Sequence, residues 1–251
     1  MYLRFVLAGL LSIGVAVFFA IAQSWAKGLV TSADAMFILL SGGCTLLAFV
    51  VVRKMGWRGK FGSLCAGFLI GMLLIFLGNV SDGIYDALWG ATPFPSLSDV
   101  MYVLGYIVVF VTLLRFLWFF RNAINRRGAL ELLSLFVLSC ISVSLVFVFS
   151  HKVTEVPVVA LSTLYPLLDV FSVGLSVMVL VFFRSRFFSP PWRWFALGVL
   201  LMGIAHFLNG LGNTEGWYTY PQPLDLFYLW GFISLGLGFS IQANPETLWR
   251  E

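Results

Sequence analysis

The chain has 251 residues, of which 61% are hydrophobic and only 10% are charged. Soluble domains are typically about 45–50% apolar and about 25% charged. This composition, with a mean hydropathy of +0.99, therefore excludes an ordinary soluble domain and indicates a chain whose solvent is lipid. The pI of about 9.1 reflects basic loops of the kind that orient membrane proteins, so no nucleic-acid partner is expected.

Eight apolar stretches predict transmembrane helices, because a helix that crosses a bilayer needs roughly 20 apolar residues. In chain order they lie at 3–22, 29–52, 61–80, 100–119, 129–150, 158–183, 194–213 and 224–242. The first is longer than the apolar region of a signal peptide, about 7–15 residues, and is kept as a span. Little remains for a soluble domain, so we expect a single all-α integral membrane domain over residues 1–251.

Lysine and arginine in short loops set the orientation of such a protein. With eight spans, the fifteen lysines and arginines fall on one side with two exceptions, Lys27 and Lys152. The acidic residues gather on the other side, apart from Glu131, Glu246 and Glu251. We therefore expect a multi-pass protein of the plasma membrane with both termini cytoplasmic and its acidic end facing outward.

An internal repeat relates the two halves of the chain. Residues 95–106 match residues 221–232 around the pattern Asp-x-x-Tyr-x-x-Gly, so that Asp99 corresponds to Asp225. Asp34 and Asp169 are expected to open the second and sixth helices. The pattern predicts a duplicated four-helix unit, a 4+4 parallel repeat with repeat A at about 1–127, repeat B at about 128–245 and a short cytoplasmic tail at 246–251. An even number of spans in each copy gives an axis along the membrane normal.

Two polar helical faces are the main candidate site. Asn79, Asp82 and Asp86 share one face of a helix through their spacing of three and seven residues, and the aligned His206, Asn209 and Asn213 do the same. Polar residues within spans usually face a bundle interior or a wet cavity, where the two faces would converge. The other interpretation places these residues in the outer interface, where a carboxylate costs little.

Asp99 and Asp225 have a structural explanation as well as a functional one. Ser96 is placed to cap a helix with Asp99 at the third position of a capping box, and Gln222 with Pro223 does the same for Asp225. The alternative is a direct role in ligand binding. Asp169 is expected to cap a helix restarted at Pro166, in preference to lying deep in a helix that begins near residue 158.

His206 is the one histidine within a predicted span. It is interpreted as a hydrogen-bonded packing residue, with two alternatives: a transition-metal ligand among oxygen donors, or a pH-sensitive group beside Asp82. The sequence leaves the metal and any cofactor undetermined. Three cysteines, Cys44, Cys65 and Cys140, are expected to be buried packing residues.

Three segments resemble a known family. The runs at 93–102, at 165–169 (Tyr-Pro-Leu-Leu-Asp) and at 224–231 are similar to those in the N-terminal multi-span membrane domains of bacterial GGDEF, EAL and histidine-kinase signalling proteins. The resemblance implies a membrane fold and a sensory role. This sequence ends at Glu251, so no output domain is expected to follow.

The favoured function is a membrane-embedded sensory or ligand-binding module with an outward-facing acidic site that signals through a partner protein. The hypothetical ligand-binding residues are Asn79, Asp82, Asp86, Asp99, His206, Asn209, Asn213 and Asp225. A structural subunit of a membrane complex, a small transporter and a lipid-modifying enzyme are the alternatives. No catalytic residue is assigned, because the sequence contains no Walker loop, HExxH or Gly-x-Ser-x-Gly motif.

Overall fold

The computed structural model describes residues 2–22, 26–121, 156–182, 190–215, 220 and 222–243, and four short pieces at 129–130, 133–134, 136–137 and 140–141. Seven long α-helices and one 3-10 helix (η2) make up most of this part of the chain: α1 (Tyr2–Ala22), α2 (Ala26–Met55), α3 (Lys60–Trp89), α4 (Leu97–Phe119), α6 (Val156–Phe182), α7 (Pro190–Glu215), η2 (Pro223–Asp225) and α8 (Leu226–Gln242). Six of these helices are long and apolar enough to cross a membrane. The fold is that of an all-helical, multi-pass membrane protein.

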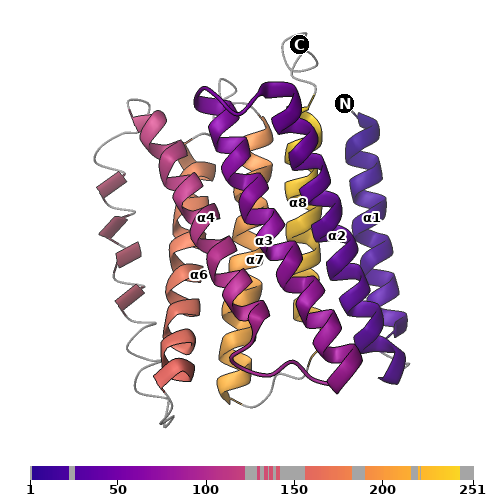
Figure 1. The fold of residues 1–251 in the computed structure, drawn as a ribbon. Coiled ribbons are helices and arrows are strands. Elements are labelled where there is room, and N and C mark those ends of the chain that lie inside the picture. Colours follow the sequence, from indigo (N-terminus) through magenta and orange to yellow (C-terminus); the bar gives the residue numbers. More distant parts are fainter. Residues whose placement is uncertain are drawn as a thin grey trace.

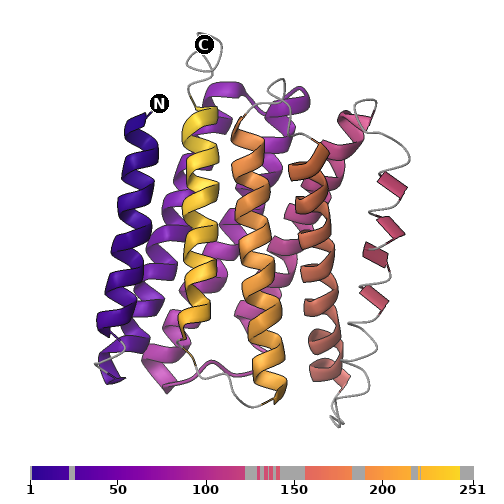
Figure 2. The ribbon, with the colours of Figure 1, turned by 180° about the vertical axis from the view of Figure 1, so that it is seen from behind.

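Six helices pack in a ring. Neighbouring contacts run in the order α2, α3, α4, α6, α7, α8 and back to α2. α1 lies outside the ring against α8 and α2, at one edge of the molecule (Figure 1). The short helical pieces between 129 and 141 lie at the opposite edge beside α6, as the reverse view also shows (Figure 2). There the ring of Phe136 packs on Phe171 of α6, with centroids 4.8 Å apart.

Several helices extend beyond the predicted apolar stretches. The helix expected at 61–80 continues to Trp89 and ends where Gly90 adopts a left-handed conformation, with φ 75°. The reason is that an apolar stretch marks the thickness of the hydrocarbon, whereas a helix continues as long as its backbone groups remain hydrogen-bonded. The fifth predicted span, 129–150, falls mostly outside the described residues.

The expectation that Asp34 and Asp169 open helices is wrong. α2 begins at Ala26, and α6 runs without a break from Val156 through Pro166, so both aspartates lie inside helices. A proline lacks only one backbone donor, and packed neighbours in a membrane bundle can compensate for the hydrogen bond that it removes. The alternative in which Asp169 lies deep in a longer helix is therefore the correct one.

Glycines allow two pairs of helices to approach closely. A Cβ atom on Gly105 of α4 would lie 3.1 Å from the carbonyl oxygen of Gly71 on α3. A Cβ atom on Gly198 of α7 would lie 2.8 Å from the carbonyl oxygen of Gly231 on α8. Membrane helices are held together largely by such close packing, since lipid provides little hydrophobic force between them.

The interior of the ring is filled at one end by aromatic side chains. Phe68 stacks on Phe195 with ring centroids 5.0 Å apart, and Phe116 stacks on Trp192 at 4.6 Å. These side chains are buried, with at most 2% of their surface exposed. They lie near the start of α3 and α7 and the end of α4, where the chain also carries its basic loop at 53–60. Cys44, Cys65 and Cys140 are buried and free, as expected for packing residues.

Candidate functional site

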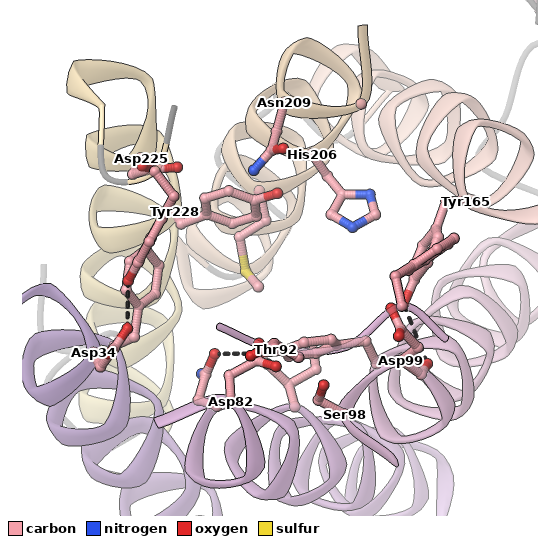
Figure 3. Close-up of a pocket in the computed structure, with 18 of the residues that line it drawn as sticks. Asp34, Asp82, Thr92, Ser98, Asp99, Tyr165, His206, Asn209, Asp225 and Tyr228 are labelled. Carbon is pink, nitrogen blue, oxygen red and sulfur yellow. Dashed lines mark hydrogen bonds between the residues drawn. The ribbon is translucent and has the colours of Figure 1, made fainter. Parts of the chain in front are cut away.

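A pocket of about 820 Å³ occupies the other end of the ring, where α3 ends and α4 begins. Side chains from α2, α3, α4, α6, α7 and α8 line it, together with residues of the loop that joins α3 to α4. Figure 3 shows Asp34, Asp82, His206 and Tyr228 pointing into this space from different helices. All six aspartates of the chain are among the lining residues: Asp34, Asp82, Asp86, Asp99, Asp169 and Asp225.

Asp82 is held by a tyrosine from the next helix. The Tyr102 hydroxyl lies 2.7 Å from the Asp82 Oδ2 atom and 2.8 Å from the Asn79 Oδ1 atom. A hydroxyl carries one hydrogen, so it satisfies one of these two acceptors at a time. The Asn79 amide nitrogen has no hydrogen-bond partner in the part of the chain that the structure describes. The polar face predicted on α3 is therefore turned toward the bundle interior.

Asp99 combines a structural role with a position in the pocket. Its carboxylate accepts a hydrogen bond of 2.7 Å from the Ser96 backbone N–H, and its own N–H donates to the Ser96 hydroxyl at 3.3 Å. The predicted capping box is confirmed. The Tyr165 hydroxyl donates to the second carboxylate oxygen at 2.9 Å, which ties α4 to α6.

Asp225 repeats this arrangement at the start of the last helix. Its carboxylate accepts a hydrogen bond of 2.7 Å from the backbone N–H of Gln222, and Pro223 occupies the first helical turn, as predicted. That turn is a short 3-10 helix that leads into α8. The Asp225 side chain is only 1% exposed, so its carboxylate is buried at the edge of the pocket.

Asp34 and Asp86 are two further carboxylates in the pocket lining. Asp34 accepts a hydrogen bond of 2.6 Å from the Tyr220 hydroxyl, and Asp86 accepts one of 3.3 Å from the Thr92 hydroxyl. Tyr220 precedes η2 and Thr92 lies in the loop after α3, so both loops are anchored to helices by an aspartate. Hydroxyl groups therefore satisfy part of the acceptor capacity of each carboxylate, which has two oxygens.

His206 pairs with Asp169, which the sequence did not anticipate. Its Nδ1 atom lies 2.7 Å from the Asp169 Oδ2 atom, across the contact between α7 and α6. Asp169 is 1% exposed and His206 is 20% exposed. The hypothesis of a histidine beside Asp82 is thus replaced by a pair with Asp169. Sequence spacing missed the pair because it joins different helices and because Asp169 was assigned to a helix end.

Three tyrosines surround the His206 ring. The ring centroid lies 4.7 Å from that of Tyr165, 5.3 Å from that of Tyr106 and 6.2 Å from that of Tyr228. The sequence did not single out these tyrosines as site residues. A signal existed, because Tyr228 belongs to the repeated Asp-x-x-Tyr pattern, as does Tyr102.

The structure brings most of the predicted site residues together. Asn79, Asp82, Asp86, Asp99, His206, Asn209 and Asp225 all line the one pocket. Asn213 lies on α7, but its side chain is outside the described part of the chain. In the described ranges, no group of three or more histidine, cysteine, aspartate or glutamate side chains could hold a metal ion.

Comparisons of this chain with protein-family models, curated proteins and solved structures found no match. The functional argument therefore rests on the geometry of the pocket.

Proposed function

We propose that this protein is a membrane-embedded sensory or ligand-binding module whose ligand occupies the acidic pocket. The observation that carries the proposal is the gathering of all six aspartates of the chain around one cavity of about 820 Å³. Ligand pockets in proteins are typically about 300–1,000 Å³ and combine an apolar lining with a few placed polar groups. Ionisable residues within membrane spans are costly, which makes a functional role the default interpretation.

The proposed topology has eight spans, with both termini cytoplasmic in the plasma membrane and the pocket open to the outside. Basic residues at 53–60 and at Arg121 lie at the end of the bundle away from the pocket, which agrees with the positive-inside rule. The apolar stretch at 129–150 is the fifth of these spans, in addition to the seven long helices of the described residues. Its described pieces are helical and include Phe136, which packs on α6.

The proposed architecture is a duplicated four-helix unit. The contact of Gly71 with Gly105 and that of Gly198 with Gly231 support it, because these glycines align in the same register as Asn79 with His206 and Asp99 with Asp225. The aligned pair Phe68 and Phe195 stack on each other, as residues near a twofold axis would. In a duplicated unit the two polar faces meet at this axis, which would place the pocket between the halves.

Binding is favoured over transport because tightly packed side chains close the inner end of the pocket. Met202 and Phe232 line the pocket and also belong to the buried aromatic core. A transport path would need polar residues that continue beyond the pocket into the inner half of the bundle. Ser41, Ser172 and Ser176 lie there, but they are fully buried and are not among the lining residues. Ser41 donates its hydrogen bond to the Phe37 carbonyl in its own helix, as packing serines do.

The position of the pocket between six helices supports a sensory role. Tyr102, Tyr165 and His206 each bridge two helices at its wall. A ligand that changes these contacts would bias how the helices pack, and a partner protein would read the change at the cytoplasmic end. The resemblance of the three segments to membrane domains of bacterial signalling proteins agrees with this proposal.

The test is the thermal stability of the purified protein in detergent across a panel of inorganic ions, amines, neutral solutes and lipids. A ligand that binds only the folded state raises stability by about 2.7 kcal/mol at a hundredfold excess over its dissociation constant. We expect a shift that is lost in an Asp82→Asn, Asp86→Asn double variant. Arg115→Gln is the control, because Arg115 is exposed on α4 outside the pocket.

Two results would contradict the proposal. A panel without any shift, together with a double variant as stable as the wild type, would leave a structural subunit of a membrane complex as the better account. Flux of an ion or solute into liposomes that contain the protein would favour a transporter instead.

A further inference from the structure

The charge of the lining indicates the sign of the charge on the ligand. Among the residues that the structure describes, the lining holds six aspartates and one histidine but no lysine or arginine. His206 already pairs with Asp169, so the described lining residues supply at most one positive charge. Several carboxylates in a membrane bundle are stabilised only when positive charge or hydrogen-bond donors accompany them. A cation is therefore favoured over a neutral molecule, and an anion is disfavoured.

Two buried groups at the wall lack partners among the described residues. The Asp169 Oδ1 atom accepts no hydrogen bond and the Asn79 amide nitrogen donates none, although these side chains are only 1% and 8% exposed. Buried polar groups in folded proteins are nearly always paired, and each exception calls for an explanation. Both residues line the pocket. A ligand that donates to Asp169 and accepts from Asn79 would complete the site.

The size and the lining distinguish an organic cation from a metal ion. The cavity of about 820 Å³ is far larger than one water molecule, whose share of liquid volume is about 30 Å³. The carboxylates are spread around the wall, and no three metal-binding side chains of the described residues converge. Aromatic rings stand between the carboxylates, and aromatic faces attract organic ammonium groups. Those in the lining include Phe37, Tyr102, Tyr106, Tyr165, Phe207 and Tyr228.

We propose that the pocket binds a small organic cation, an ammonium compound with an apolar body and a hydrogen-bond acceptor. The ammonium group donates a hydrogen bond to the free carboxylate oxygen of Asp169, and the apolar body lies against the tyrosines. The acceptor of the ligand accepts a hydrogen bond from the amide nitrogen of Asn79. This inference rests on the proposed ligand-binding function and specifies the class of its ligand.

The probes that test the proposal are pairs of matched size that differ in charge. Tyramine, whose phenol oxygen supplies the acceptor, is compared with 4-(2-hydroxyethyl)phenol, and 6-amino-1-hexanol with 1,6-hexanediol, alongside Mg²⁺ and Ca²⁺ as chlorides. Thermal stability and isothermal calorimetry are measured on the full chain in detergent. We expect both amines to raise the melting temperature with dose and their alcohols to have no effect. Because these comparisons use the wild-type protein, they do not depend on a variant that folds.

Variants then locate the cation. Asp169→Asn keeps the size of the side chain but removes its charge, and we expect it to weaken amine binding by about tenfold or more, the loss of one charge-assisted hydrogen bond. Arg115→Gln, outside the pocket, should leave amine binding unchanged. Equal amine affinity in wild type and folded Asp169→Asn would overturn the assignment of Asp169.

The outcomes separate this inference from the proposed function. Equal shifts with amines and alcohols would overturn the assignment of the ligand as an organic cation. Shifts with Mg²⁺, Ca²⁺ or another class in the wider panel, but none with amines, would do the same. Either result would still support the proposed ligand-binding function. Failure of every compound and ion to shift stability would overturn both.

Discussion

The Nδ1 atom of His206 lies 2.7 Å from the Oδ2 atom of Asp169, and this contact joins α7 to α6 at the wall of the acidic pocket. It is a pair between two predicted spans, with the carboxylate 1% exposed and the imidazole 20% exposed. The other carboxylate oxygen has no hydrogen-bond partner in the described part of the chain. Asp169 is therefore both a link between helices and a buried acceptor at the pocket wall whose second oxygen has no partner among the described residues.

The pair should be energetically coupled. In a double-mutant cycle of Asp169→Ala and His206→Ala, we expect a coupling energy within about 0.5–3 kcal/mol, the range found for residues in direct contact. Unfolding in mixed detergent and SDS measures it. Asp169→Ala combined with Ser63→Ala, at the other end of the bundle, should be additive within about 0.5 kcal/mol. Additivity of the first pair would show that the contact carries no energy.

Close packing at the glycines should be sensitive to a single methyl group. Gly198→Ala places a Cβ atom 2.8 Å from the Gly231 carbonyl oxygen, so the backbones of α7 and α8 must separate. Overpacking of this kind costs about 1–3 kcal/mol. Gly43→Ala in α2 meets nothing within 4 Å and is the matched control. It should be neutral or slightly stabilising, since alanine favours helix over glycine by about 1 kcal/mol. Equal thermal stability of the two variants would contradict this account.

Loss of the α4 cap should have a moderate effect. Ser96→Ala removes the hydroxyl that accepts the Asp99 N–H, and such substitutions cost about 0.5–2 kcal/mol. Ser81→Ala is the control, because the Ser81 hydroxyl donates only to the Leu77 carbonyl of its own helix. We expect the first variant to melt at a lower temperature than the second. A reversed order would show that the capping box adds little stability.

The hydroxyl of Tyr102 should stabilise the polar wall of α3. Tyr102→Phe keeps the ring but leaves Asp82 and Asn79 without this donor, with an expected loss of about 0.5–1.5 kcal/mol of unfolding free energy. Tyr85→Phe serves as the comparison. The Tyr85 ring packs on Trp89 with centroids 5.3 Å apart, and this ring contact is kept when the hydroxyl is removed. Denaturation of both variants measures the difference, and a Tyr102→Phe variant as stable as Tyr85→Phe would argue against a structural role for the hydroxyl.

Cysteine labelling in intact cells checks the proposed orientation. The natural cysteines are at most 6% exposed, so they should react slowly with a membrane-impermeant maleimide. Phe94→Cys, in a position 48% exposed beside the pocket, should be labelled from outside. Trp57→Cys, in a position 56% exposed at the basic end, should be labelled only after permeabilisation. The opposite pattern would invert the proposed topology.

The sequence by itself determined the class of the protein and identified many of the polar residues that line the pocket. Apolar stretches of membrane length are a local property, so they predicted helices at α2, α3, α4, α6, α7 and α8. Helix capping is local as well, which is why Asp99 with Ser96 could be recognised from spacing alone. The face that carries Asn79, Asp82 and Asp86 followed from helical periodicity.

Tertiary structure alone decided which residues meet. Asp169 with His206, Asp99 with Tyr165, and Asp34 with Tyr220 are contacts between segments far apart in the chain, and no local pattern encodes them. The continuous course of α6 through Pro166 also depended on tertiary structure, because packing against neighbouring helices compensates for the hydrogen bond that proline removes. The pocket exists because six helices close into a ring whose aromatic core fills only one end, and only the packed arrangement of those side chains reveals that.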